Sequence, residues 1–323
     1  MIDHFSDEQV QQYREDGFLI VENLISFGTV EVLRERFDHI FDGYHDLVVW
    51  PDEYYWQKGR DPEDAHRVLA GLWRADPVVA RETFSGNFGQ LACQLEGASS
   101  ARLWSDVAMY KPEGGKPFDI HQDAAFMCWV DPVWNWTCWI ALDDTYADGG
   151  TLVYVRGSHK WGPQPAPGKT QIISETMDDW TDYVEQFAPE GKGVELVSVE
   201  ISAGSAAFHT GWIWHGSGPN TRPGNIRRSY SVHMIPATSK HHSRIRHRAY
   251  SRYFAPGQLE FNEDFFPVIW SADGHRTPWL GEYSEQELPI DAFSPDAVRM
   301  LDEIEVEPWT FVASGSPRHH AER

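Results

Sequence analysis

The sequence is poor in cysteine and in basic residues, and each shortage narrows what the protein can be. Its 323 residues include 3 cysteines, an odd number with no CxxC spacing, which predicts reduced, buried thiols of a cytosolic protein. Lys and Arg number 27 against 49 Asp and Glu, so the formal net charge is −22. Nucleic acid and anionic membrane surfaces bind to a basic face, and neither is therefore an expected partner.

Long apolar runs and a signal-peptide pattern are also missing. No run reaches the roughly 18 apolar residues that a membrane span needs, and the opening MIDHFSDEQV does not have the shape of a signal peptide. The cytoplasm is the expected location. The 41% hydrophobic and 24% charged residues are typical of a soluble globular protein, and the chain is long enough to bury a full core.

The first 100 residues predict helices. Ser6 is expected to cap a helix, with Gln9 as its capping-box partner. That helix should end at Asp16–Gly17, and the following FLIVE has strand character. Apolar residues at helical spacing predict a second helix over 29–47, and a third helical stretch is expected over about 75–97.

The pattern of apolar and turn-forming residues changes after residue 100. Short β-type runs broken by Gly, Pro, Asn and Asp fill about 101–236, which predicts a sandwich or barrel. Helices first and strands afterwards favour an α+β fold, mainly β, in which the N-terminal helices buttress a β-core. The irregular stretch 240–312 is expected to cover that core within a single domain over 1–312, and 313–323 is expected to be a loose tail.

The run HQDAAF, residues 121 to 126, contains a candidate metal site. If DIHQDAAF is a strand, His121 and Asp123 project to the same face, because side chains alternate with period two. A third ligand is His215 in WHGSGPN, about 90 residues downstream. Two His and one carboxylate on one face of an octahedron form the facial triad of non-haem Fe(II) oxygenases, which leaves positions open for a cosubstrate and O2.

A cation follows the candidate distal histidine at a useful distance. The 2-oxo acid that usually binds beside such iron carries a second carboxylate, and Arg227 lies 12 residues after His215. A guanidinium fork suits bidentate carboxylate binding better than a lysine does. On a strand, Ser229 would share the face of Arg227 and add a hydroxyl, whereas Arg228 would point the other way.

Together, HxD, HGSGPN and the arginine give a specific resemblance. The stretches YKPEGGKPFDIHQDAAF, CWIALDDTYADGGTLVYVRGSHKWG and WHGSGPNTRPGNIRRSYSVHMIP resemble the phytanoyl-CoA dioxygenase family of Fe(II)/2-oxoglutarate oxygenases, over roughly residues 5 to 240. The resemblance implies a double-stranded β-helix, also called a jelly roll or cupin-like fold. It also implies iron bound by His121, Asp123 and His215. Arg227 would hold the far carboxylate of 2-oxoglutarate, with Arg228 as the alternative because the spacing is one residue longer than expected.

The resemblance extends to the surroundings of the iron. Four residues are implied contacts of the cosubstrate: Gln122, Trp139, Ser217 and Ser229. Three others are candidates for the substrate pocket: Trp129, Trp212 and Lys111. Core packing is the competing interpretation for the tryptophans, and solvent exposure is the competing interpretation for Lys111 and for Lys116.

Other histidines compete with the proposed ligands. His209 lies six residues before His215, and we interpret it as a loop or satisfied core histidine because GSGPN does not follow it. His159 is expected to shape a turn, and His233 to pack within a strand.

The sequence thus predicts an Fe(II)- and 2-oxoglutarate-dependent dioxygenase that consumes O2, hydroxylates a small organic molecule and releases succinate and CO2. The carboxylate of Asp123 argues against halogenation, because halogenating relatives have a small residue there. Two alternatives remain: a non-catalytic small-molecule-binding jelly roll, and a zinc-type hydrolase or isomerase on the same scaffold. Arg227 discriminates, since neither alternative needs a cation beyond the distal histidine.

Overall fold

Two antiparallel sheets carry the residues singled out above. A computed structural model describes residues 2–43, 50–163 and 177–285. The larger sheet has, in spatial order, β1 (Phe18–Val21), β10 (Ala206–Thr210), β7 (Trp136–Ala141), β12 (Arg227–Ile235), β4 (Ser100–Lys111), β3 (Arg67–Ala70) and β2 (Glu53–Tyr54), and β14 (Val268–Ser271) also pairs with β4. The smaller sheet has β5 (Phe118–His121), β11 (His215–Ser217), β8 (Leu152–Val155) and β9 (Leu196–Ser198).

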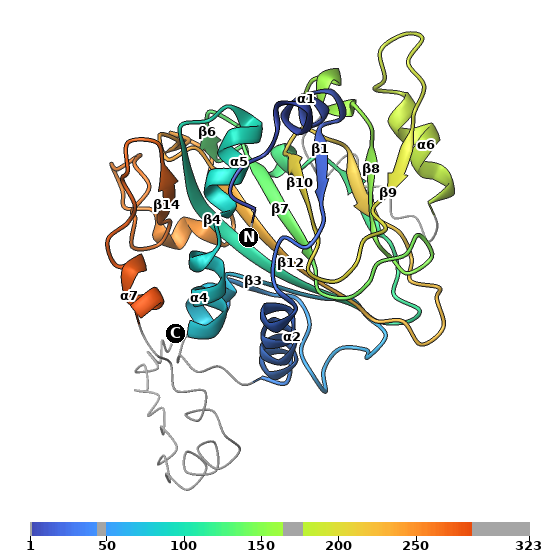
Figure 1. The fold of residues 1–323 in the computed structure, drawn as a ribbon, viewed down its shortest axis with the longest axis horizontal. Coiled ribbons are helices and arrows are strands. Elements are labelled where there is room, and N and C mark those ends of the chain that lie inside the picture. The colour runs from blue at the N-terminus through green and yellow to red at the C-terminus, as the bar shows by residue number, and fades with distance from the viewer. Residues whose placement is uncertain (1, 44–49, 164–176, 286–323) are drawn as a thin grey trace, which may run out of the picture. The chain divides into compact units, whose positions relative to one another are not determined.

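Helices cover the outer faces of both sheets (Figure 1). The larger sheet packs against α1 (Asp7–Asp16), α2 (Phe27–Phe41), α4 (Pro77–Ser85) and α5 (Phe88–Glu96). The short α3 (Leu72–Ala75) precedes α4, and α7 (Leu280–Glu285) packs beside α4. On the smaller sheet, Trp180 and Val184 of α6 (Asp178–Glu185) pack against Ile120 and Val153. This leaves the inner faces for a second core and for the site.

Strand alternation decides what faces inward. On β12, Tyr230, Val232 and Met234 pack with the helices in the main core. The intervening side chains project to the opposite face of the sheet, where Arg227 and Ser229 lie. Between the sheets, Trp139 and Ala207 pack against Leu152 and Tyr154, among others. The inner surface is therefore partly apolar and partly lined by polar side chains.

The N-terminal helices agree with the sequence-based expectations in part. The capping box of Ser6 and Gln9 is present, and Gly17 ends α1 in the left-handed region at φ 85°. The strand after it is β1. The second helix begins at Phe27 and ends at Phe41, and residues 44–49 of its expected range lie outside the described residues. The stretch 75–97 contains two helices, α4 and α5, separated at Gly86 and Asn87. The three strands β2, β3 and β14 were not expected.

The expectation of a strand through HQDAAF is wrong beyond His121. β5 ends there, and residues Asp123–Phe126 form a 3₁₀ turn, η1. Backbone amides of Ala125 and Met127 bond to carbonyls three residues back, a spacing that a strand does not allow. Period-two alternation therefore does not explain where the Asp123 carboxylate points.

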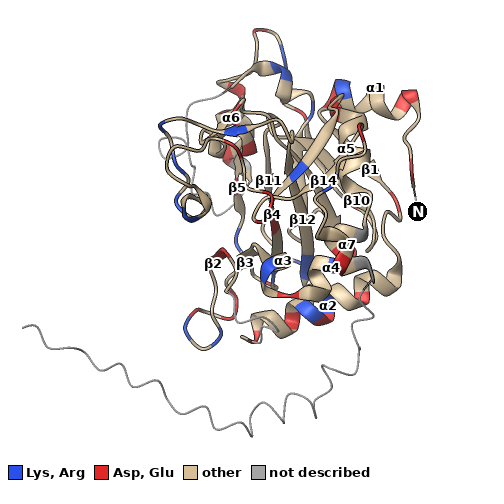
Figure 2. Ribbon diagram, turned by 90° about the vertical axis from the view of Figure 1, so that its left-hand side faces the viewer, with Lys and Arg blue, Asp and Glu red and all other residues tan. Residues whose placement is uncertain are grey.

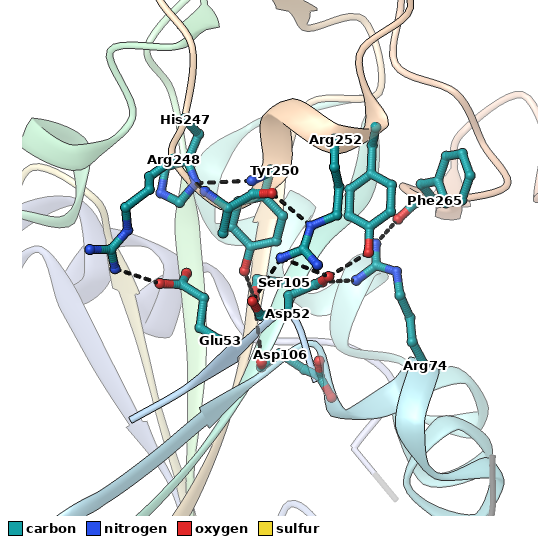
Figure 3. Close-up of polar contacts among 12 residues, drawn as sticks. Asp52, Glu53, Arg74, Ser105, Asp106, His247, Arg248, Tyr250, Arg252 and Phe265 are labelled. Carbon is teal, nitrogen blue, oxygen red and sulfur yellow. Dashed lines mark hydrogen bonds and ion pairs between the residues drawn. The ribbon is translucent and has the colours of Figure 1, made fainter. Parts of the chain in front are cut away.

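The expected cover is described as far as residue 285. It contains β13 (Lys240–His241), paired with β6 (Val130–Asp131), then η3 (Tyr250–Tyr253), β14 and α7. Figure 3 shows contacts that attach η3 and its surroundings: Asp52 accepts from Arg74, and Tyr250 bonds to Ser105. Tyr253 of η3 also donates to Asp52. The rest of the predicted cover and the predicted tail, 286–323, lie outside the described residues.

Between β8 and α6 lies a further 3₁₀ turn, η2 (Ser158–Trp161).

Three broad expectations can be compared with the structure. All three cysteines are free, and Cys93 and Cys138 are buried, but Cys128 is exposed, so the expectation of burial was wrong for it. Acidic and basic residues share the surface helices α1 and α2 (Figure 2). Within 2–43, 50–163 and 177–285, no helix combines the length and apolar character needed to cross a membrane.

Candidate metal centre and cosubstrate site

His121 and His215 lie opposite one another on adjacent antiparallel strands. The register of β5 and β11 pairs the two residues directly, and their ring centroids are 4.3 Å apart. Each ring uses Nδ1 to bond a backbone carbonyl two residues earlier, at 2.7 Å to Asp119 and 3.1 Å to Ile213. A carbonyl oxygen only accepts, so both Nδ1 atoms carry a proton, and Nε2 is the nitrogen through which each ring, when neutral, could bind a metal.

Asp123 completes a set of three donors. Its Oδ1 lies 3.3 Å from Nε2 of His121 and 3.5 Å from Nε2 of His215. One ligand atom from each residue lies within 4.8 Å of the others. Burial alone would raise the pKa of Asp123, but His215 and the hydrogen bonds from the histidines hold that pKa well below its usual range. Two imidazole lone pairs and a carboxylate facing one another fit a divalent cation such as Fe(II).

The second oxygen of Asp123 is held from the other side. Thr137 on β7 donates to Oδ2 at 3.1 Å, and His209 on β10 lies 3.4 Å from the same atom through Nε2. Burial lowers the pKa of His209 to about 4, so the ring is neutral. The Tyr154 hydroxyl lies 2.7 Å from its Nδ1. The consistent tautomer accepts from Tyr154 and donates from Nε2 to Asp123.

A second polar chain reaches the same carboxylate. Nδ1 of His233 lies 2.8 Å from the Thr137 hydroxyl. Since that hydroxyl gives its proton to Asp123, His233 donates to Thr137. The geometry makes His209 a buried core histidine that supports the carboxylate and His233 a packed strand residue, as interpreted from the sequence. Neither Thr137 nor Tyr154 was expected at the site from the sequence. Thr137 could have been, because it lies two residues before Trp139 and alternation places Thr137 and Trp139 on the same face of the strand.

Arg227 lies on the inner face of β12 and is 1% exposed. Its guanidinium donates to the Gly150 carbonyl at 3.0 Å, to Ser229 at 2.7 Å and to Ser217 at 3.0 Å. The Trp139 ring centre lies 5.9 Å away. Burial lowers the pKa of Arg227 to about 10, which still leaves it charged at neutral pH. Among the described residues no carboxylate forms an ion pair with it, so the site can accept an external one.

Arg228, the alternative anchor, faces the other way. It forms ion pairs with Asp143 at 3.0 Å and with Asp38 of α2 at 3.1 Å. Its charge is thus already neutralised on the helix-covered face. Of the two arginines, Arg227 is therefore the one without an acidic partner among the described residues.

Lys111 differs most from its sequence-based interpretation. The competing interpretation, that Lys111 is exposed to solvent, is wrong, because the residue is 0% exposed. Nζ donates to the hydroxyl of Ser217 at 2.5 Å and to the carbonyls of Ser217 and Gly218 at 3.1 and 2.6 Å. Lys111 therefore lies beside Arg227 at the expected cosubstrate end, whereas Lys116 is exposed as expected.

The remaining candidates have mixed placements. Gln122 is 1% exposed and donates from Nε2 to the Trp212 carbonyl at 2.6 Å, which joins the two ligand-bearing segments. Trp129 is 2% exposed and stacks on Tyr250 within the aromatic cluster under the cover. Trp212 is partly exposed. His159 bonds the Arg14 carbonyl from Nε2 and shapes a turn, as expected.

Aromatic side chains surround the outer edge of His121. Phe118 and Phe126 contact its ring edge-to-face, with centroids at 5.4 and 5.7 Å. Phe126 is 40% exposed. A large exposed aromatic side chain beside a candidate metal ligand provides an apolar surface for a small molecule.

Comparisons with known proteins agree on family and fold. A family model described as phytanoyl-CoA dioxygenase (PhyH) matches residues 13–229. Phytanoyl-CoA dioxygenase 1 of Oryza sativa subsp. japonica is 24% identical over 259 residues, which span 71% of this chain and 89% of that protein. The α-ketoglutarate-dependent carbocyclase SnoK from nogalamycin biosynthesis matches at a TM-score of 0.63 and 21% identity, covering 83% of this chain and 97% of SnoK. The predicted double-stranded β-helix is therefore confirmed.

A second solved structure names the cofactors. The epimerase SnoN, in complex with Fe3+, alpha ketoglutarate and nogalamycin RO, matches at a TM-score of 0.61 and 22% identity, covering 82% of this chain and 98% of SnoN. Iron and 2-oxoglutarate are the cofactor set that the sequence predicted. The cluster of His121, Asp123 and His215 is a possible site for that iron.

Proposed function

Because the chain belongs to the phytanoyl-CoA dioxygenase family, we propose that it is an Fe(II)- and 2-oxoglutarate-dependent dioxygenase that hydroxylates a small organic molecule. The observation that carries the proposal is the pairing of two features on the inner faces. One is the three-donor cluster of His121, Asp123 and His215. The other is the buried Arg227, which has no carboxylate partner among the described residues.

Each residue has a distinct task in this proposal. When bound, iron with 2-oxoglutarate and O2 supplies the oxidation, with release of succinate and CO2. The two histidines and Asp123 would hold the metal through Nε2 and Oδ1. Arg227 receives the far carboxylate, and Ser229, which accepts from Arg227, has its own hydroxyl proton left to donate. The centre of the Trp139 ring lies 5.9 Å from the guanidinium carbon, so the ring would be a further contact of the cosubstrate.

Asp123 supports oxygenation rather than halogenation. A halide needs the coordination position that a carboxylate fills, and here Oδ1 points between both histidines. The carboxylate is also held by Thr137 and His209 on its second oxygen. Both oxygens thus have an assigned role.

The aromatic edge supports a substrate with an apolar surface. Phe118 and Phe126 flank His121 at the outer side of the cluster. An apolar substrate packed against these two rings would lie beside His121, and the contact would exclude water there.

The proposal is tested without air. Fe(II) and 2-oxoglutarate should together produce a visible charge-transfer band, and admitting air should then produce succinate. Replacing His215 by Ala should abolish both signals. Absence of the band and of succinate with the unaltered protein would exclude the proposal and leave a binding protein or a zinc-type enzyme.

A further inference from the structure

The row of side chains that contains the two candidate metal-ligand histidines continues onto a third strand. Tyr154 on β8 lies directly opposite His215 on β11, which lies directly opposite His121 on β5. Directly opposed residues project to the same face of a sheet, and the ring centroids of Tyr154 and His215 are 6.1 Å apart. A phenol, which can give up one electron, is therefore the neighbour of a candidate iron ligand.

The phenol of Tyr154 is buried and its hydroxyl bonds to a base. The residue is 0% exposed, and its hydroxyl donates to Nδ1 of His209 at 2.7 Å. Nε2 of His209 in turn lies 3.4 Å from Oδ2 of Asp123. The ring of Phe18 stacks on the phenol, with centroids 4.5 Å apart and an interplanar angle of 17°. The proposed hydroxylation uses this phenol only to orient His209.

The base on the hydroxyl makes oxidation of the phenol feasible. A phenol that loses an electron becomes strongly acidic, so the electron leaves readily only where a base takes the proton at the same time. Nδ1 of His209 is in place to take it. The histidine that gains this proton is stabilised by the carboxylate of Asp123 on its other side. The proton thus follows an existing hydrogen bond, and no side chain has to move.

Neighbouring indoles have no such base. Trp104 contacts the ring of His233, with centroids 5.4 Å apart, and Trp214 directly precedes His215. The Nε1 atoms of Trp104 and Trp214 are buried and have no hydrogen-bond partner among the residues that the structure describes. Oxidation of either indole would leave a buried positive charge without compensation, which is costly. Of these three rings, Tyr154 is the best placed electron donor.

We propose that Tyr154 is a redox-active residue that delivers one electron to the iron when O2 is consumed without substrate, while its phenolic proton passes to His209. The inference rests on the proposed function, since O2 and 2-oxoglutarate supply the oxidant. It goes beyond hydroxylation, because it assigns what the metal centre oxidises when no substrate is bound.

The electrons and atoms of this step balance. Reduction of O2 takes four electrons: two come from 2-oxoglutarate as it becomes succinate and CO2, one from iron as it becomes ferric, and one from Tyr154. One oxygen atom enters succinate, and the other becomes hydroxide with a proton from water. At Tyr154 the O–H bond breaks, an N–H bond forms at Nδ1 of His209, and a neutral phenoxyl radical remains. Oxidation is thus directed to a buried ring and away from the ligands His121 and His215.

The test follows the radical by electron paramagnetic resonance. Protein loaded with Fe(II) and 2-oxoglutarate, without substrate, is mixed with aerated buffer and frozen at intervals. A free-radical signal should appear, and it should narrow in protein produced with ring-deuterated tyrosine, which distinguishes tyrosine from tryptophan. Tyr154→Phe should lose the signal. Tyr230→Phe should keep it, because Tyr230 is equally buried and donates to Asp106 at 2.8 Å, but packs in the main core beneath the helices.

A second variant tests the proton acceptor. His209→Gln keeps a hydrogen-bond acceptor for the phenol but offers no base, so most of the signal per bound iron should be lost. Iron is measured in the same samples, because His209 also supports Asp123. If Tyr154→Phe does not fold, the deuterium comparison on the unaltered protein and the His209 variant decide.

The remaining outcomes separate the inference from the proposed function. A signal that survives in Tyr154→Phe, or that does not narrow with deuterated tyrosine, overturns the inference. Succinate formed by the unaltered protein without any radical signal also overturns it and leaves the proposed function intact. If the unaltered protein forms neither succinate nor a radical, the proposed function fails and the inference with it.

Discussion

His209 holds Asp123 by the oxygen that does not face His121 and His215. Its Nε2 lies 3.4 Å from Oδ2, whereas His121 and His215 lie beside Oδ1. Since Tyr154 bonds the other ring nitrogen, the ring orientation is fixed from both ends. Hydrogen bonds to a ligating carboxylate orient it and tune the metal.

Replacing His209 by Leu should weaken Fe(II) binding about tenfold without abolishing it, since partners of this kind contribute tenfold to 100-fold. Competition with a chromophoric chelator under argon measures the affinity. His159→Leu is the matched control, because His159 bonds a carbonyl of α1 instead, and should leave the affinity unchanged. A loss as complete as that in His215→Ala would make His209 a ligand and contradict the geometry.

Neighbouring arginines on β12 should behave differently. Arg227→Met should weaken 2-oxoglutarate about 100-fold, because it removes a buried, charge-assisted fork. Arg228→Met should leave that affinity within about twofold, since its ion pairs are with Asp143 and Asp38 and partly exposed pairs contribute mainly to stability, at about 1 kcal/mol or less. The two variants are compared by calorimetry and by urea unfolding. A larger loss of affinity in the Arg228 variant would reverse the assignment.

Buried Asp106 should make stability depend on pH. Burial raises its pKa from 3.8 to about 6, so the folded state binds the proton more tightly than the unfolded state. The stabilisation is present at low pH and is lost as pH rises through 6. Asp106→Asn lacks this dependence, so the variant should gain about 2 kcal/mol relative to the unaltered protein between pH 4.5 and 7.5.

Urea unfolding of both proteins at the two pH values measures that change. Any effect of the substitution on stability that does not depend on pH cancels in this comparison. This includes the effect of replacing the one carboxylate oxygen of Asp106 that has no hydrogen-bond partner. An unchanged difference between the two proteins would show that Asp106 does not titrate in this range.

The stability gained by attaching η3 to the rest of the fold should depend on Asp52 much more than on Glu53. The Asp52 side chain is 1% exposed and pairs with Arg74 at 2.5 Å (Figure 3). Asp52→Asn should lower the free energy of unfolding by about 3 kcal/mol, because it leaves a buried cation unpaired. Glu53→Gln should cost less than about 1 kcal/mol, since its partner Arg248 has an 80% exposed side chain. Equal costs would show that the buried pair does not hold η3.

Local patterns predicted much of this protein. The cap of Ser6 and the strand β12 follow from short-range spacing, and so does the opposite orientation of Arg227 and Arg228. The structure also brings together His121, Asp123 and His215, which the sequence grouped by type and order. Alternation was the wrong reason for Asp123, because a 3₁₀ turn and not a strand positions it.

The contacts that could not be predicted from the sequence depend on pairing between strands that are distant along the chain. Thr137 and His209 meet Asp123 because β7 pairs with β10 and places them opposite one another. Lys111 is buried because β4 ends beside Ser217, 106 positions away. Neither contact has a local signature, and an isolated lysine after a tyrosine is ordinarily exposed.

The hydrogen bonds between the two ligand-bearing segments have an implication for how the chain tolerates change in length. The amide of Ala124 bonds the Gly211 carbonyl, and Gln122 bonds that of Trp212. A Cβ on Gly211 would lie 2.2 Å from the Asn135 side chain. An insertion or deletion between Trp212 and His215 would therefore shift His215 relative to His121 and Asp123, so length variation among relatives should be absent there and concentrated in other loops.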